Sequence, residues 1–412
     1  MNQIKFLVQV IILILFSKNL SAQTIVWTKK ANPLLNSING VAFNSDGQKI
    51  VTGTNCHPAS IRFFDATSGA IDWDYTVGSG FMCIMGVTFS TNSNYIAAIE
   101  EFGNIFIFDN TVDTPSLINT INIGTTYGFS TAISPDNSSV AVGCSNGRLK
   151  IYTISSGILA YDIPGHPSWV TCVNYSPNGN FIVTGGNDNK VKIWQNTGVL
   201  LYTCNGHTDD ITNVKVSSDN HYIISSSKDN QIKIWDASTG SLVRTIIGHT
   251  DDVNGIAIST DGSKIVSVSS DSSCKIWDFN NGNLLSTFGV PDSGAVNAVA
   301  WSPNANYIVT GNVLSDVVLW DVSNALSAKS MSAIEDMNIV LYPNPVSNEL
   351  KLQLSNNYKI IKTEIYNSTG IQIYSSNLFL ESINVEHLPK GIYTLKIYTS
   401  ENKSSHHSFT KK

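Results

Sequence analysis

The stretch Gly206–Asp236, GHTDDITNVKVSSDNHYIISSSKDNQIKIWD, decides the fold of this chain. It holds three short β-rich runs separated by polar turns: Ile211–Val216, His221–Ser225 and a third that ends in Trp235-Asp236. Such runs joined by tight turns predict an antiparallel meander. One meander cannot bury both of its faces, so it needs neighbours of the same kind.

The meander recurs along the chain with a period of about 43 residues, a length typical of one propeller blade. An aromatic residue recurs at the position of Trp235, in steps of 41 to 44 residues, at Phe64, Phe108, Tyr152, Trp194, Trp277 and Trp320. The turn between the first two runs keeps the same register and begins at Asn44, Ser90, Ser134, Ser176, Ser217, Ser259 and Ser302. Seven strand-rich units predict an all-β chain built as a seven-bladed β-propeller of four-stranded sheets.

Units four to six resemble the WD-repeat family. They carry its Gly-His and Trp-Asp signatures as Gly165-His166 with Trp194-Gln195, Gly206-His207 with Trp235-Asp236, and Gly248-His249 with Trp277-Asp278. The resemblance covers residues 23–328 and implies a buried tetrad in each of these units. The implied tetrads are His166, Thr184, Asp188 and Trp194; His207, Ser225, Asp229 and Trp235; and His249, Ser267, Asp271 and Trp277. Units one to three and seven depart from the pattern, so we expect those blades to rest on apolar packing alone.

The first residues are expected to direct export. Residues 1–22 combine Lys5, an apolar run and a small-residue cleavage site ending at Ala22, the features of a signal peptide. The apolar run is short for a membrane-spanning helix, which disfavours an uncleaved anchor. Thr24–Lys29 reads as a strand without a unit of its own, while the run after Trp320 is poor in strand-forming residues. We therefore expect the N-terminal strand to complete blade seven and close the ring.

The C-terminal part, residues 338–412, follows a Ser/Ala-rich linker at 329–337 and has short strand runs that predict a small Ig-like β-sandwich. It resembles the type A C-terminal sorting domain of the type IX secretion system of Bacteroidota. The matching residues are Tyr342, Pro343, Asn344, Pro345, Gly370, Leu388, Pro389, Gly391, Tyr393, Lys411 and Lys412. The resemblance implies passage through the periplasm and across the outer membrane, to the medium or the cell surface. An adhesive Ig-like module is the alternative.

The six cysteines belong to two groups. Cys144, Cys172, Cys204 and Cys274 lie in or beside strand runs, where buried free thiols are common. Cys56 and Cys83 are expected on the same face of neighbouring blades, where they either form a disulfide or remain unpaired. The spacing of Cys and His residues predicts no metal site, and we expect no cofactor.

Charge and motifs limit the functions to consider. The chain has a formal net charge of −6 with no basic stripe, which argues against nucleic acid or an anionic membrane surface as partner. It has no GxSxG, HExxH or glycine-rich phosphate loop, so we assign no catalytic residue. The paired acids Asp209-Asp210 and Asp251-Asp252 are read as solvated rim carboxylates rather than as a cation site.

The resemblance places partner binding on the face that carries the Gly-His loops. The candidate rim residues there are Trp169, Asn187, Asp210, Lys228, Asp252 and Ser270. Trp169 is either the main anchor for a partner or a packing residue against the next blade. We expect a non-enzymatic scaffold for an extracellular protein or glycan, with the secretion machinery as a second partner of the tail. The alternative is an extracellular hydrolase or lyase that uses acids such as Asp210 and Asp252 at the central funnel.

Overall fold

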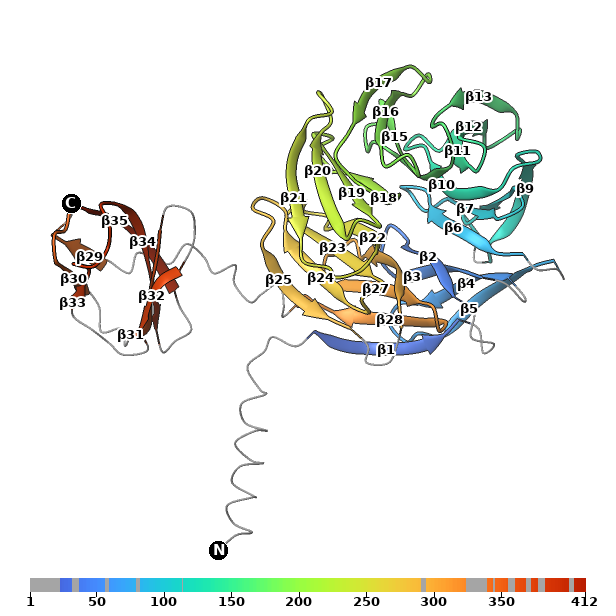
Figure 1. Ribbon diagram of the computed structural model, residues 1–412. Helices are drawn as coiled ribbons and strands as arrows, with labels where there is room; N and C mark the ends of the chain where they lie inside the picture. The colour runs from blue at the N-terminus through green and yellow to red at the C-terminus, as the bar shows by residue number, and fades with distance from the viewer. Residues whose placement is uncertain are drawn as a thin grey trace, which may run out of the picture. The chain divides into compact units, whose positions relative to one another are not determined.

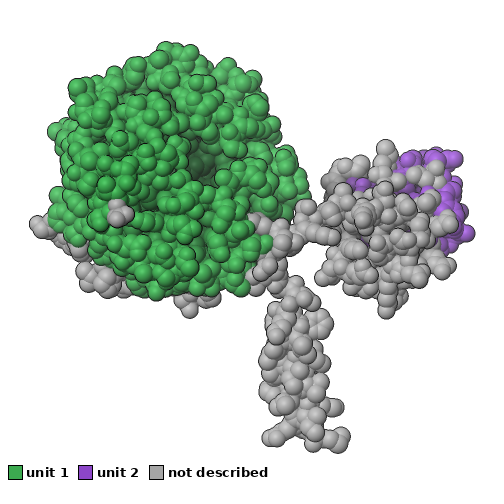
Figure 2. All heavy atoms as spheres, turned by 180° about the vertical axis from the view of Figure 1, so that it is seen from behind, with its two compact units in different colours: residues 1–325 green, residues 326–412 purple. Residues whose placement is uncertain are grey.

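The computed structural model describes residues 23–31, 37–55, 59–78, 82–112, 114–289, 294–323, 339–343, 345–354, 360–367, 372–376, 382–399 and 404–412. The named elements over these residues are β-strands joined by turns. They belong to two compact units, unit 1 at residues 1–325 and unit 2 at 326–412 (Figure 2). Over the described residues, no helix has the length and apolarity that a bilayer crossing needs. The expected signal peptide and linker lie outside the described residues.

Over the described residues, unit 1 holds seven four-stranded antiparallel sheets, named here sheets one to seven (Figure 1). Sheets one to three consist of β2 (Ile38–Phe43), β3 (Lys49–Thr54), β4 (Ala59–Asp65) and β5 (Ile71–Val77); β6 (Ile84–Phe89), β7 (Tyr95–Glu100), β8 (Asn104–Asp109) and β9 (Ser116–Asn122); and β10 (Gly128–Ile133), β11 (Ser139–Cys144), β12 (Arg148–Thr153) and β13 (Leu159–Pro164). Sheets four to six consist of β14 (Val170–Tyr175), β15 (Phe181–Gly186), β16 (Val191–Gln195) and β17 (Leu200–Cys204); β18 (Ile211–Val216), β19 (Tyr222–Ser227), β20 (Gln231–Asp236) and β21 (Leu242–Ile247); and β22 (Val253–Ile258), β23 (Lys264–Ser269), β24 (Cys274–Asp278) and β25 (Leu284–Phe288). Sheet seven consists of β26 (Val296–Trp301), β27 (Tyr307–Asn312), β28 (Asp316–Asp321) and β1 (Thr24–Lys30).

The seven sheets form a closed ring. The first strand of each sheet is innermost, and each inner strand contacts the next, from β2 and β6 round to β26 and β2 (Figure 1). The apolar residues therefore gather between neighbouring sheets. One cluster, for example, joins Ile61 and Phe63 of sheet one to Ile96 and Phe108 of sheet two. Each sheet is thus a wedge whose flanks are hidden from water only by its neighbours.

The ring closes through the start of the chain, as the sequence predicted. Strand β1 pairs antiparallel with β28, which sets Ile25 opposite Trp320 and Lys29 opposite Val317. Trp27 is 8% exposed, and its indole N–H donates to the carbonyl of Ala66 in sheet one over 3.0 Å. The closing strand therefore contacts the sheets on both sides of the junction, and it covers the edge of β28.

The turn after each inner strand has a conformation that explains its sequence. Its fourth residue lies in the left-handed region in all seven sheets: Gly47, Ser93, Asn137, Gly179, Asn220, Gly262 and Ala305. In six sheets the first turn residue is a serine whose hydroxyl donates to the Asp or Asn two residues later, as Ser217 does to Asp219. Short polar side chains and glycine suit both demands, so the turn recurs with the sheets.

Each inner strand has a β-bulge near its start, and in five of the seven sheets the bulged side chain links neighbouring sheets. The bulged side chain donates to the next sheet in sheets one, four, five, six and seven: Asn39 to Ile84 O, Thr171 to Ile211 O, Thr212 to Val253 O, Asn254 to Val296 O and Asn297 to Ser37 Oγ. Sheets two and three carry Met85 and Phe129 at this position. Hydrogen bonds therefore hold the inner edge of the ring together, in addition to apolar packing.

Over its described residues, unit 2 contains two antiparallel sheets. One has the order β29 (Ile339–Tyr342), β30 (Glu349–Leu354), β33 (Ser382–Asn384); the other has the order β32 (Gln372–Ser376), β31 (Ile360–Tyr366), β34 (Gly391–Thr399), β35 (Ser404–Lys411). Residues of both sheets share one core, among them Leu350, Ile383, Leu395 and Phe409. Two sheets that share one core make a small sandwich.

Candidate functional site

The signature residues of sheets four to six meet in three buried clusters, one inside each sheet. In sheet five, His207 Nδ1 lies 2.7 Å from Asp229 Oδ2, and His207 Nε2 lies 2.8 Å from Ser225 Oγ. The indole N–H of Trp235 donates to the same hydroxyl over 2.8 Å. The same bonds join His166, Thr184, Asp188 and Trp194 in sheet four, and His249, Ser267, Asp271 and Trp277 in sheet six.

The bonding pattern fits the following assignment of the protons. The hydroxyl accepts from the indole N–H, so its own hydrogen is available for His Nε2. That assignment makes the imidazole neutral, with its Nδ1–H donating to an ionised Asp. The polar groups of the cluster then satisfy one another within the sheet, which fits a structural role.

The pKa values of the sheet-six pair agree with this assignment. Burial alone would raise the pKa of Asp271, but hydrogen bonds from Ser273, His249 and the backbone of Thr250 lower it to about 2. Burial lowers the pKa of His249 by more than its bond to Asp271 raises it. Both shifts favour a neutral imidazole beside a carboxylate.

The expectation that sheets one, two, three and seven rest on apolar packing alone is wrong. In sheet seven, Trp320 Nε1 donates to Thr310 Oγ1 over 3.0 Å, although the position of the tetrad Asp is taken by Leu314. In sheet two, the fully buried Glu100 accepts from Asn104 Nδ2 over 2.9 Å. Thr54 and Ser60 form a hydroxyl pair in sheet one, and Thr126 and Ser145 form another in the loops next to sheet three. These pairs use other residues than the signature, and they do not satisfy every buried polar group, because the hydroxyls of Thr52 in sheet one and Thr131 in sheet three have no hydrogen-bond partner among the described residues.

Backbone hydrogen bonds join the candidate rim residues in pairs. The backbone N–H of Asn187 donates to the carbonyl of Trp169, that of Lys228 to Asp210, and that of Ser270 to Asp252, over 3.2, 3.0 and 2.9 Å. The equivalent bond joins the loops of the other four sheets: Asn55 to Ser37, Glu101 to Cys83, Ser145 to Tyr127 and Val313 to Ala295. The rim is therefore a repeated frame, and its chemistry depends on the side chains at these positions.

Two pairs of aromatic rings, together named the aromatic row, occupy the rim of sheets two to four. Phe102, Tyr127 and Trp169 are 49%, 48% and 47% exposed. The rings of Phe102 and Tyr127 lie 5.7 Å apart, and those of Phe129 and Trp169 lie 5.1 Å apart. Of these rings, the sequence pattern predicted only Trp169, because the other three belong to units without the Gly-His signature. Aligning the units by their turns would have set Tyr127 at the Trp169 position.

Acidic loops occupy the rim of sheets five and six. Lys228 Nζ lies 3.0 Å from Asp210 Oδ2, and this hydrogen bond is the main cause that raises the pKa of Lys228. Burial, followed by the nearby charge of Asp251, raises the pKa of Asp252. The rim therefore changes from apolar to acidic between sheets four and five. Among the described residues, no group of His, Cys, Asp or Glu is arranged to hold a metal ion.

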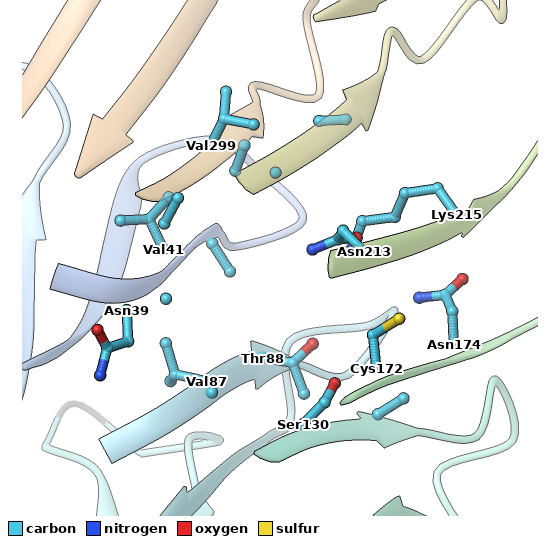
Figure 3. A pocket seen from close by; sticks show the side chains of 18 of the residues that line it. Asn39, Val41, Val87, Thr88, Ser130, Cys172, Asn174, Asn213, Lys215 and Val299 are labelled. Carbon is cyan, nitrogen blue, oxygen red and sulfur yellow. The ribbon is translucent and has the colours of Figure 1, made fainter. Parts of the chain in front are cut away.

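A cavity of about 430 Å³ lies inside the ring, lined by its inner strands. Figure 2 shows a hollow on the face of unit 1, and Figure 3 shows the cavity from close by. Lys215 is the one charged residue among the described residues that line it. Neither Asp210 nor Asp252, the acids expected for a funnel enzyme, belongs to its lining.

The described residues of the sorting motif belong to unit 2. Tyr393 donates its hydroxyl to the carbonyl of Pro389 over 2.7 Å, and its ring stacks on Phe409 at 5.6 Å. Gly391 pairs with Lys411 across β34 and β35. The remaining described motif residues are Tyr342 and Pro343, joined by a cis peptide, and Pro345, Leu388 and Lys412. Asn344 and Gly370 lie outside the described residues.

The described cysteines fall into the two groups that the sequence suggested, buried free thiols and a cysteine in a disulfide. Cys144, Cys172, Cys204 and Cys274 are buried free thiols, and burial raises the pKa of Cys144 to about 11. Cys83 is disulfide-bonded. Cys56 lies outside the described residues, so its pairing with Cys83 remains a prediction.

Two family models match the chain. One, described as "WD domain, G-beta repeat", matches residues 157–195, 198–236, 240–278 and 282–321. The other, described as "Secretion system C-terminal sorting domain", matches residues 340–411. The first match overlaps sheets three to seven, and the second covers nearly all of unit 2.

Curated relatives match over part of their length. Protein groucho of Drosophila melanogaster is 24% identical over 162 residues, which is 36% of this chain and 22% of the relative. Autophagy-related protein 16 of Arabidopsis thaliana is 30% identical over 172 residues, 40% of this chain and 32% of the relative. A probable coatomer subunit beta' of Schizosaccharomyces pombe is 34% identical over 71 residues, 16% of this chain and 9% of the relative. The chain thus spans less than a third of the length of each of these relatives. Together, the repeats, the ring of sheets and the tail identify this chain as an exported WD-repeat β-propeller protein with a type IX secretion system C-terminal sorting domain.

Proposed function

We propose that the propeller is a non-enzymatic scaffold outside the cell that holds a protein partner on its rim. The observation that carries the proposal is the aromatic row of Phe102, Tyr127, Phe129 and Trp169. Three of these four rings are nearly half exposed, although large apolar side chains are normally buried. Exposed aromatic rings that lie together on one rim are typical of binding hot spots.

The charge next to the row indicates what the partner carries. Asp209, Asp210, Asp251 and Asp252 follow it around the rim, with Lys228 as the cation paired to Asp210. A partner that presents apolar anchors followed by basic groups complements both parts of the rim. Among the relatives, the coatomer subunit is by its name part of an assembly, which fits a scaffold.

A capture experiment tests this proposal. The full chain is immobilised and exposed to the surface fraction and culture medium of the producing cell, beside the variants Tyr127→Ala and Trp169→Ala. Tyr161→Ala is the matched control, because Tyr161 is 41% exposed on the outer strand β13. We expect the wild type and the control to hold the same protein, and both rim variants to lose about tenfold or more in affinity.

Two outcomes would contradict the proposal. Equal capture by all four proteins would show that the rim does not carry binding. Capture that survives protease treatment of the fraction but not periodate oxidation would show that the partner is a glycan.

A further inference from the structure

The wall of the central cavity is strongly asymmetric. On each inner strand, the third and fifth residues line the cavity. In sheets one, six and seven these positions hold only Gly and Ala. In sheets four and five they hold Cys172 and Asn174, and Asn213 and Lys215. Polar groups on one side thus face an open, small-residue wall on the other (Figure 3).

The polar side has unused hydrogen-bonding capacity. None of the described residues forms a hydrogen bond or ion pair with the Lys215 amine, or a hydrogen bond with the side-chain amides of Asn174 and Asn213. Lys215 is half-buried, and partial burial without a carboxylate beside it lowers the pKa of its amine. An anion that binds beside such a half-buried, unpaired cation would stabilise its charged form.

We propose that the cavity binds a small organic monocarboxylate, held by Lys215 and oriented by Asn174 and Asn213. Lys215 supplies one positive charge, which matches one carboxylate, whereas the second charge of a phosphate would stay uncompensated. The two amides supply N–H donors for the carboxylate oxygens and acceptors for further ligand groups. The small residues of sheets one, six and seven leave room for the ligand's body.

The size of the cavity fits this ligand class. Its volume of about 430 Å³ lies within the roughly 300–1,000 Å³ of small-molecule sites. Val41, Val87 and Val299 lie on its other side and supply apolar contacts (Figure 3). Of the four rings proposed as partner anchors, only Phe129 is among the described residues that line the cavity. Loss of partner binding at the rim and loss of ligand binding in the cavity can therefore be measured separately.

Calorimetric titration of the full chain with acetate, propionate and benzoate tests the site, with phosphate and chloride as competing anions. Lys215→Met is the main variant, since replacing an unpaired, half-buried cation by an apolar chain of similar length should not unfold the ring. Lys190→Met is the control, at an exposed lysine of the same charge. We expect at least one carboxylate to bind the wild type and the control equally, and to lose about tenfold or more in affinity with Lys215→Met.

A second measurement uses the wild type alone. Lysine-labelled protein should show the Lys215 amine titrating at a higher pH when the carboxylate is bound, because an anion beside an amine favours its charged form. Unchanged affinity in Lys215→Met, an unmoved Lys215 titration, binding of none of the three carboxylates, or phosphate binding as tightly as the best carboxylate would each overturn the proposal.

Discussion

At the scale of single residues, the buried clusters show how polar groups are kept inside an apolar wedge. Ser225 joins two otherwise unpaired ring nitrogens, because its hydroxyl accepts from Trp235 and donates to His207. Asp229 then holds the histidine in one tautomer. Removing any member would leave the others buried without partners, which costs about 1–3 kcal/mol for each unsatisfied group.

The sheet-six cluster predicts loss of stability in acid. The folded pKa of Asp271 is about 2 against an ordinary value of 3.8, so its ionised form contributes fully above pH 3.8. That contribution, roughly 2 kcal/mol, is lost as pH falls from 3.8 towards 2. The lowered pKa of His249 acts in the same direction, because its stabilisation is present above pH 6.5 and declines as pH falls below it.

Asp271→Asn tests this linkage. We expect the variant to unfold at lower urea concentration at neutral pH, and its stability to fall less steeply than that of the wild type below pH 4. Asp251→Asn, at an exposed carboxylate of the same loop region, is the control. The measurement is urea unfolding over a series of pH values, and parallel curves for wild type and Asp271→Asn would disprove the assignment.

At the scale of elements, the sequence predicted the features that recur in every unit. It missed the features that depend on the pairing of neighbouring strands or occur in one sheet alone. The period of aromatic residues and turns predicted the sheets, and the unassigned strand Thr24–Lys29 predicted ring closure. The bulges were missed because a register shift between two strands leaves little trace in either strand alone. Glu100 and Asn104 were missed because a polar pair buried in one sheet has no counterpart in the others.

The candidate site was likewise predicted only in its repeated part. The repeat predicted where the rim positions lie, since the bonded loop pairs keep the register of the sheets. The aromatic row could not be read from it, because Tyr127 and Phe129 stand in a unit without the signature. Lys215 was also missed, because strand alternation alone does not show that the facing strands carry Gly and Ala.

Ring closure gives a prediction for β1. Trp27 stacks on Phe64 at 6.1 Å and bonds to Ala66, so it links sheet seven to sheet one. We expect Trp27→Ala to lower the free energy of unfolding by about 3–5 kcal/mol, the usual cost of removing a buried tryptophan. Val26→Ala is the control on the same strand, because Val26 is 43% exposed.

Chemical unfolding and size-exclusion chromatography measure the outcome together. An opened ring exposes the edge of β28, so the variant should also form concentration-dependent oligomers. If Trp27→Ala were as stable and as monodisperse as Val26→Ala, β1 would not be what closes the ring.

At the scale of the whole molecule, the two units have separate cores. Among the described residues, the core cluster of unit 2 consists of unit 2 residues, among them Val346, Leu350 and Phe409. Val346 also fixes the C-terminal end, since its N–H donates to Thr410 O and its carbonyl accepts from Lys412 N–H. Folding of the propeller is therefore expected to be independent of the tail, whereas export depends on the tail.

A chain truncated after residue 337 tests this separation in the producing cell. We expect its propeller to unfold at the same urea concentration as that of the full chain, because the described residues of the propeller form cores of their own. We also expect the truncated chain to remain in the periplasm, because the residues that match the sorting domain, 340–411, are gone. The control is Lys351→Ala, at an exposed side chain of the same unit, which should be exported normally. Fractionation of cells and medium measures export, and truncated protein in the medium at wild-type amounts would show that another signal suffices.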